Sequence, residues 1–505
     1  MFETLWTALQ IAFNPGTFML ICAGTVVGVI FGALPGVSAS MAVALALPFT
    51  YTMTGPVAIA FLVSVYCASI TGGGITAILF KIPGTPSSAP TTFDGYPMAQ
   101  RGEAGKALGF SLVASAFGGL LAAFCMAIIS TPLAAVALKF GPGELFAVSM
   151  MGLSVLTCLD NGNVIKTLLS GLLGLFLATI GTDPQTGVAR FTWGSTTLLG
   201  GIEMIPVMIG LFAVTEVLKQ TMKRTKKGGM EKMESTSGEG GKFKNELPKF
   251  KEFFAVKWTM LRASILGTIV GILPGAGATI ASFLSYTVEK KISKNGDKFG
   301  TGIADGIVAS ECANNAATGG SMVPLLSLGI PGGNAAAIMM SALVLKGVQV
   351  GPLLVRSQPE YLSAVFGSML LTNIVMVIVA MLIAKVFAKI LQIPYSILGP
   401  VIVLLAVIGA YALKNSTGDV VLMVGAGIIG YLFTKLGFSA AALVLGLVLG
   451  SMCEENLRRA YQIANGSWFQ ALNSPIAIVL LLVCAAMIII PIVKSAIPQK
   501  DTAKK

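Results

Sequence analysis

The chain has 505 residues, of which 55% are hydrophobic and 11% are charged. Soluble domains carry roughly 25% charged residues, so this composition excludes an ordinary globular protein and indicates a polytopic membrane protein. Histidine is absent from the sequence, which excludes Ser-His-Asp triads, histidine metal ligands and histidine proton relays. The formal net charge of +12 would suit nucleic acid, but the basic excess is concentrated in one linker, so we expect no nucleic-acid partner.

The first half of the chain, residues 1–218, is predicted to form one membrane repeat of apolar helices. Two arms joined at Pro35-Gly36 either cross the membrane or form a re-entrant hairpin, and the next segment is expected to be interrupted near Thr71–Gly74. The predicted segments, in order, are the arms 18–34 and 38–51, the interrupted span 57–80, the polar stretch 81–106, and spans at about 107–130, 143–159, 164–181 and 198–218.

A basic linker, residues 219–260, follows. Its Gly, Ser and Thr content indicates flexibility, and its Lys and Arg excess beside membrane spans indicates the cytoplasmic side. Residues 261–455 are predicted to form a second membrane repeat, and residues 456–505 add an unmatched span and a basic tail. The predicted segments are a hairpin over 262–288, a segment at about 304–329 interrupted at 318–320, spans near 361–391, 395–413, 418–436 and 438–453, and the unmatched span 475–493.

The two halves share three short motifs in the same order. Helix breakers inside apolar sequence persist only where they line a cavity or lie buried in protein, and paired breaks at matching points indicate a transporter binding site. We therefore predict two inverted structural repeats with helical hairpins and broken helices, and roughly 11–14 membrane segments. The motif pairs are GVIFGALPGVSAS at 28–40 with GTIVGILPGAGAT at 267–279, Thr71-Gly72-Gly73 with Thr318-Gly319-Gly320, and Ile82-Pro83-Gly84 with Ile330-Pro331-Gly332.

The number of spans suggests an orientation. The first half carries an odd number of crossings, which would invert the second half relative to it. With the linker in the cytoplasm, the N-terminus would lie outside and the basic C-terminus inside. Arg458-Arg459 would then lie outside, against the positive-inside rule.

The Pro-Gly tips and the Ile-Pro-Gly loops are candidate substrate-binding elements. Free backbone N–H groups and hydroxyls at a helix N-terminus attract anions; the alternatives are a tight interhelical turn and plain helix termination. The candidate substrate-binding residues are Pro35, Gly36, Ser38, Ser40, Pro83, Gly84, Thr85, Pro274, Gly275, Gly277, Thr279, Pro331, Gly332 and Asn334.

The Thr-Gly-Gly segments and the neighbouring Asn pair are candidate cation-binding elements. Broken helices would expose carbonyls beside Thr and Asn oxygens, which are ligands that sodium accepts; the alternative is a notch in which a crossing helix packs. The candidate cation-binding residues are Thr71, Gly72, Gly73, Asn314, Asn315, Thr318, Gly319 and Gly320.

Charged residues outside the linker receive separate interpretations. Glu311 and Asp305 lie in apolar sequence and are weighed as cation ligands or proton carriers, beside a structural role. Lys81 and Lys346 are expected to reach towards the membrane surface. Four residues of the polar stretch are predicted to form a solvated loop: Asp94, Arg101, Glu103 and Lys106.

These motifs resemble the large permease subunit of the tripartite tricarboxylate transporter family, over essentially the whole chain. The match is carried by GALPGVSAS at 32–40, TGGGITAILFKIPGTPSSAPTTFDGYPMAQRGEAGKALG at 71–109, GILPGAGATIASFLSY at 271–286 and ASECANNAATGGSMVPLLSLGIPGGNAAA at 309–337. The resemblance implies a bacterial inner-membrane symporter that works with a small membrane subunit and a periplasmic binding protein. It implies import of a carboxylate such as citrate, driven by a sodium or proton gradient, with no other cofactor.

Several alternatives stay open at this point. A channel would also use broken helices, and the substrate could be a dicarboxylate or an aromatic acid. An intramembrane enzyme would need a catalytic set, and Asp94 and Asp160 lack partners at matching positions. By analogy with other two-hairpin carriers, the core is expected to slide against the outer spans as an elevator; a homodimer is left open.

Overall fold

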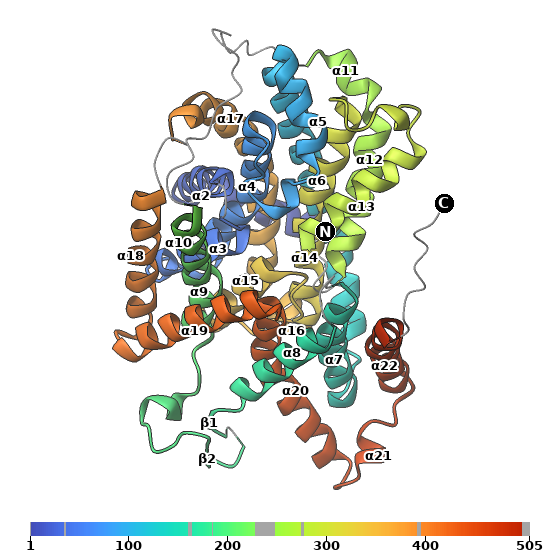
Figure 1. Cartoon of the computed structure of the whole chain (residues 1–505). Coiled ribbons are helices and arrows are strands. Elements are labelled where there is room, and N and C mark those ends of the chain that lie inside the picture. Colours follow the sequence, from blue (N-terminus) through green and yellow to red (C-terminus); the bar gives the residue numbers. More distant parts are fainter. Residues whose placement is uncertain are drawn as a thin grey trace. The chain divides into compact units, whose positions relative to one another are not determined.

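The computed structural model describes residues 2–34, 37–159, 164–183, 185–227, 248–273, 277–390 and 395–496. These ranges are almost entirely helical (Figure 1). Within them the sole sheet is the antiparallel pairing of β1 (Gly181–Thr182) with β2 (Ala189–Arg190). The prediction of an all-α polytopic membrane protein is confirmed.

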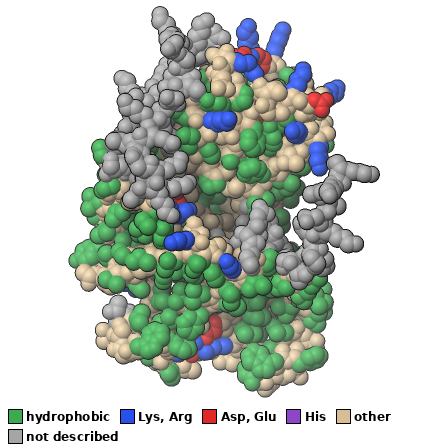
Figure 2. All heavy atoms as spheres, viewed as in Figure 1, with side chains coloured by type: hydrophobic (Ala, Val, Ile, Leu, Met, Phe, Trp, Pro, Cys, Tyr) green, Lys and Arg blue, Asp and Glu red, His purple; other side chains and the backbone are tan. Residues whose placement is uncertain are grey.

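Six helical segments of the described residues are long and apolar enough to cross a membrane, and shorter apolar helices accompany them. Hydrophobic side chains cover much of the face seen in Figure 2, with Lys and Arg most frequent in its upper part and a few in the middle and near the lower edge. The six segments are Pro15–Ala33, Gly55–Phe80, Thr91–Ala137, Met204–Met222, Pro359–Ala384 and Thr417–Leu436.

The helices form two compact units, and each unit takes segments from both halves of the chain. Unit 1 comprises Met1–Leu138 and Ile205–Tyr431, and unit 2 comprises Lys139–Met204 and Leu432–Lys505. The predicted repeat boundaries at 218, 260 and 455 therefore stay predictions about sequence halves, which differ from these packing units.

Unit 1 is built around α4 (Gly55–Phe80) and α14 (Ala304–Leu328). Helix α4 packs against α2, α3 and α17, and α14 packs against α6, α12 and α13. The other elements of this unit, with α9 and α19 reaching its boundaries, are α1 (Phe2–Ala12), α2 (Pro15–Ala33), α3 (Ala39–Ala46), η1 (Leu47–Thr50), η2 (Pro86–Ser88), α5 (Thr91–Met98), η3 (Ala99–Glu103), α6 (Ala104–Ala137), α9 (Met204–Ile209), η5 (Gly210–Val214), α10 (Thr215–Lys227), α11 (Phe250–Ala255), α12 (Lys257–Ile272), α13 (Gly277–Ile292), η6 (Gly296–Lys298), α15 (Asn334–Leu345), α16 (Pro352–Ser357), α17 (Pro359–Ile390), α18 (Tyr395–Lys414) and α19 (Thr417–Leu436).

Unit 2 packs α20 against α7 and α8, and α22 against α7. A Cβ built on Gly446 of α20 would lie 2.1 Å from the Gly171 carbonyl oxygen of α8, so these two helices touch through bare backbone. The elements of this unit are α7 (Pro142–Leu159), α8 (Val164–Ala178), β1, β2, η4 (Thr197–Gly200), α20 (Ala440–Ile463), α21 (Trp468–Ala471) and α22 (Pro475–Ala496).

The crossing of α2 with α4 is repeated by the crossing of α12 with α14. In each, glycines spaced four residues apart face backbone carbonyls, which permits the close approach typical of small-residue motifs in membranes. At the first crossing, a Cβ built on Gly28 would lie 2.5 Å from the Val65 carbonyl oxygen, and one on Gly32 would lie 2.0 Å from the Ser69 carbonyl oxygen. At the second crossing, a Cβ on Gly267 would lie 2.4 Å from the Ala313 carbonyl oxygen, and one on Gly271 would lie 2.6 Å from the Ala317 carbonyl oxygen. The two sequence motifs therefore serve the same packing.

Candidate functional site

A carboxyl group is enclosed in the interior of unit 1. Glu311 of α14 is fully buried and accepts hydrogen bonds from the hydroxyl of Ser115 (3.0 Å), the amide of Asn314 (3.3 Å) and the hydroxyl of Thr91. These partners come from α5, α6 and α14, and all three are neutral. Burying a carboxylate without a charged partner is costly, so we assign Glu311 to the candidate functional site.

The Asn pair of α14 extends this polar core to the other half of the chain. The Asn315 amide donates to the Asn314 side-chain oxygen at 3.1 Å, and the Thr71 hydroxyl of α4 donates to the Asn315 side-chain oxygen at 3.1 Å. All three side chains are fully buried. Three of the residues proposed for cation binding thus lie together, linked to Glu311 through Asn314.

Thr318 lies one turn further along α14. Its hydroxyl donates to the Asn315 backbone carbonyl at 2.6 Å and lies 3.7 Å from the sulfur of Cys67 on α4. One turn beyond, the hydroxyls of Tyr66 and Ser321 lie 3.3 Å apart. Polar contacts between α4 and α14 therefore continue over several turns in the fully buried stretch of both helices.

The predicted interruptions at Thr71–Gly74 and 318–320 are wrong, because α4 and α14 run through these residues as continuous helix. The glycines serve packing instead. A Cβ on Gly72 would lie 2.5 Å from the Val29 carbonyl oxygen, and one on Gly320 would lie 2.4 Å from that of Thr268. Free carbonyls are therefore not offered at Gly72, Gly73, Gly319 or Gly320, and the oxygens available there belong to side chains.

Both helices end a few residues later, in the same way. Lys81 and Gly329 adopt left-handed backbone conformations, with φ of 56° and 75°. The amides of the following Ile82 and Ile330 donate to the carbonyls of Thr76 and Pro324, six residues back, at 3.4 and 3.2 Å. The Ile-Pro-Gly motifs thus mark the true helix ends.

The Ile-Pro-Gly loops lie against the ends of α2 and α12. A Cβ on Gly84 would lie 2.1 Å from the Gly32 carbonyl oxygen, and one on Gly332 would lie 2.7 Å from that of Gly271. The Gly84 amide donates to the Gly73 carbonyl at 3.2 Å. Thr85 is buried beside Gly73, so the substrate-binding and cation-binding candidates of the first half adjoin.

The remaining substrate-binding candidates fall into two groups. The Ser38 hydroxyl accepts a hydrogen bond from the Met41 amide at 3.1 Å and caps α3. Gly277 begins α13 with a φ of 62°. Of the others in the described residues, the buried ones are Ser40, Pro331 and Gly332, and the half-buried ones are Pro83, Thr279 and Asn334. Four candidates at the Pro-Gly tips lie outside the described residues: Pro35, Gly36, Pro274 and Gly275. Asp160 also lies outside them.

The solvated loop predicted around Asp94 is wrong for Asp94 itself, which is fully buried. Its carboxylate accepts from the backbone amides of Gly300, Gly302 and Ile303 at 2.8–3.1 Å and from the Tyr286 hydroxyl at 2.8 Å. These amides immediately precede α14, so Asp94 caps that helix from the other half of the chain. The sequence offered no local signal for a cap supplied from so far away.

The other residues of that polar stretch are partly exposed, as predicted, but Arg101 and Lys106 contact residues far along the chain. Arg101 donates to the carbonyls of Thr301 and Gly302, beside the Asp94 cap. Glu103 pairs with Arg101 at 3.6 Å. Lys106 pairs with Glu252, and this hydrogen bond lowers the pKa of the Glu252 carboxyl.

Lys346 makes the reciprocal contact. It follows α15, and its ammonium donates to the carbonyls of Tyr51 and Met53 at 3.1 and 2.8 Å, just before α4 begins. A membrane-surface role was predicted for this lysine, whereas the structure ties it to backbone. Asp305, weighed as a cation ligand, accepts from the hydroxyls of Thr259 and Ser293 at 3.3 Å and lies at the start of α14.

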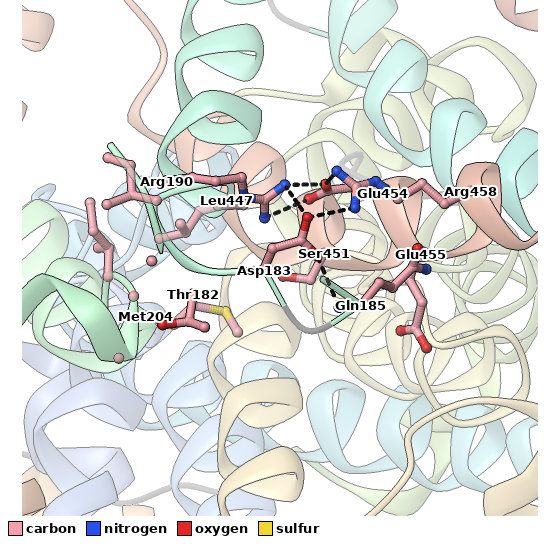
Figure 3. A pocket seen from close by; sticks show the side chains of 16 residues that line it. Thr182, Asp183, Gln185, Arg190, Met204, Leu447, Ser451, Glu454, Glu455 and Arg458 are labelled. Atoms are coloured by element: carbon pink, nitrogen blue, oxygen red, sulfur yellow. Dashed lines mark hydrogen bonds and ion pairs between the residues drawn. The ribbon is translucent and has the colours of Figure 1, made fainter. Parts of the chain in front are cut away.

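Unit 2 holds a cavity of about 280 Å³, shown in Figure 3. Arg458 of α20 pairs with Asp183 (2.7 Å) and Glu454 (2.8 Å), and Arg190 pairs with the same two carboxylates. The hydrogen bond from Arg458 holds the pKa of the Asp183 carboxyl well below its usual range. These four side chains form a ring that links the β1–β2 segment to α20. Because its two positive and two negative charges balance, the ring offers little to an anion.

Long apolar helices packed around a buried polar network define a multi-pass membrane protein. Comparison with known proteins gives the family. The model of the tripartite tricarboxylate transporter TctA family matches residues 18–445, so this chain belongs to that family. It is a family of transporters, and its tripartite character implies partner subunits.

Two curated relatives from Agrobacterium vitis are similar to this chain. An uncharacterized 52.8 kDa protein of the TAR-I ttuC' 3' region is 38% identical over 500 residues, covering 99% of this chain and 98% of the relative. An uncharacterized protein of the TAR-II ttuC' 3' region is 41% identical over 232 residues, covering 45% of this chain and 96% of the relative. No solved structure matches the chain.

Proposed function

We propose that this chain is the large permease subunit of a binding-protein-dependent secondary transporter of the bacterial inner membrane. It imports citrate-like tricarboxylates or related carboxylates by symport with Na⁺ or H⁺. The observation that supports the proposal best is the buried polar network of Thr71, Asn315, Asn314 and Glu311, which joins the two halves of a family member inside an apolar core. Polar groups at membrane depth mark ion and substrate pathways.

The contacts of Asp94 and Lys346 support the inverted arrangement within this proposal. The segment after α4 reaches the start of α14, and the segment after α15 reaches the start of α4. Along the two helices themselves, Tyr66 contacts Ser321 and Thr71 contacts Asn315. Because the order of contacts is reversed, α4 and α14 run antiparallel, as an inverted repeat requires.

The cargo would bind as an anion near the Ile-Pro-Gly loops, and the coupling cation near Thr71, Asn315 and Thr318. We expect Thr318→Val, which removes the hydroxyl and keeps the shape, to weaken sodium dependence of uptake more than thermal stability. Sodium-activation curves and melting temperatures of the two proteins check this. An unchanged activation curve would remove Thr318 from the cation site.

A channel is the second candidate, since it too would use buried polar groups. The test is the concentration dependence of carboxylate flux into proteoliposomes. A carrier saturates and exchanges internal for external substrate; a channel gives flux that rises with concentration and shows no exchange. Saturation with exchange supports the proposal, and its absence contradicts it.

A further inference from the structure

Glu311 has a neighbour that its hydrogen bonds do not use. The Ser111 hydroxyl of α6 is fully buried and, among the described residues, makes no hydrogen bond. Buried hydroxyls are normally paired, so an unpaired one beside a carboxyl points to a ligand that both groups could bind. Ser111 Oγ and Glu311 Oε1 both lie 2.9 Å from the point that a Cβ on Gly74 would occupy.

We propose that the Glu311 carboxylate and the Ser111 hydroxyl, which come together at Gly74, bind one sodium ion beside Asn314. The inference rests on the proposed function and adds a sodium site next to the cation site proposed near Thr71, Asn315 and Thr318. The hydroxyl of Thr91 is hydrogen-bonded to the same carboxylate oxygen, Glu311 Oε1, and its own oxygen supplies a further ligand. Oxygen donors of this kind are what hard cations select.

The single carboxylate of the site indicates the charge of the ion that it would bind. The described residues contain no group of three acidic, Cys or His side chains that would hold a metal, and divalent ions usually recruit several carboxylates. One carboxylate is neutralised by one monovalent cation. The site therefore suits Na⁺ better than Ca²⁺ or Mg²⁺.

The hydrogen-bond partners of Glu311 suit a charged carboxylate with a bound cation. The amide of Asn314 can only donate to Glu311, and the hydroxyls of Ser115 and Thr91 are placed as donors to both carboxylate oxygens. Donors on both oxygens stabilise the ionised form of the carboxyl. A bound sodium ion would balance the negative charge of that form.

The experiment measures thermal unfolding of the purified full chain in detergent, with NaCl replaced stepwise by choline chloride at constant ionic strength. Because a ligand of the folded state raises stability with its concentration, we expect the wild-type melting temperature to rise with sodium. Glu311→Gln should abolish this rise, and Ser111→Ala should reduce it. Ser130→Ala is the matched control, because Ser130 is a second buried hydroxyl of α6 without a hydrogen bond in the described structure; it should keep the wild-type response.

A sodium response that survives in both Glu311→Gln and Ser111→Ala would overturn the inference. So would a wild-type chain that responds to pH and not to sodium. The readout needs no substrate, so it separates this site from the wider function. A sodium response that depends on Glu311, together with absent carboxylate uptake, would contradict the proposed function and leave the ion site standing.

Discussion

Glycine hydrogens meet backbone carbonyl oxygens where α2 crosses α4 and where α12 crosses α14. Such contacts leave no room for a methyl group, since a Cβ on Gly32 would lie 2.0 Å from the Ser69 carbonyl oxygen. Backbone on both sides cannot swing away as a side-chain tip would. We expect Gly32→Ala to cost roughly 1–3 kcal/mol, the usual range for overpacking.

The melting temperature of the purified protein checks this. Gly425→Ala on α19 is the matched control, because a Cβ there meets no atom within 4 Å. It should be neutral or gain up to about 1 kcal/mol from helix propensity. Equal effects of the two substitutions would contradict the packing role of Gly32.

Asp183 is a second single residue that stabilises the fold, here through its ion pair with Arg458 in unit 2. Its pKa is lowered chiefly by the hydrogen bond from Arg458, so the stability it contributes is present above the ordinary Asp pKa of about 4 and is lost as the pH falls towards the lowered value. We expect Asp183→Asn to melt below wild type at neutral pH. The gap should narrow in acid; a gap independent of pH would contradict the ion-pair role.

Helices α4 and α14 are held by reciprocal contacts from the other half of the chain. Asp94 supplies an anion to the amides before α14, and Lys346 supplies a cation to the carbonyls before α4. Each contact satisfies backbone groups that a helix start or a turn leaves free. These contacts fix the two helices that carry the polar network.

Replacing Asp94 tests the first of these contacts. Asp94→Ala leaves at least one buried amide unpaired and should cost at least the roughly 1–3 kcal/mol of such a loss. Asp94→Asn keeps an acceptor for Gly302 and Ile303 and should cost less. Melting temperatures of both variants give the ordering, and equal or inverted losses would rule out the capping role.

The elements differ in how well sequence could predict them. Hydropathy located the spans, and Ile-Pro-Gly with its left-handed cap residue marks real helix ends at Phe80 and Leu328. Thr-Gly-Gly was misread as a break, because glycine permits both a break and close packing and only the facing carbonyl decides. Asp94, Ser111 and the Asp183 ring escaped prediction, since their partners lie far away in the sequence.

At the scale of the whole chain, both units contain helices from both halves. An elevator would move one group of helices past another, and we keep it as a hypothesis by analogy. Cysteine pairs engineered across the moving boundary should crosslink in one transport state and not in the other. Identical crosslinking in both states would exclude sliding.

The central claim is cation-driven, binding-protein-dependent uptake of a carboxylate. The most direct measurement is accumulation of labelled citrate in proteoliposomes that contain this chain, its small membrane partner and the binding protein, with and without an inward sodium gradient. We predict accumulation above the external concentration that requires both the gradient and the binding protein. The claim would be contradicted if gradient-dependent accumulation persisted without the binding protein. It would also be contradicted if neither citrate nor a related carboxylate accumulated under a sodium or proton gradient.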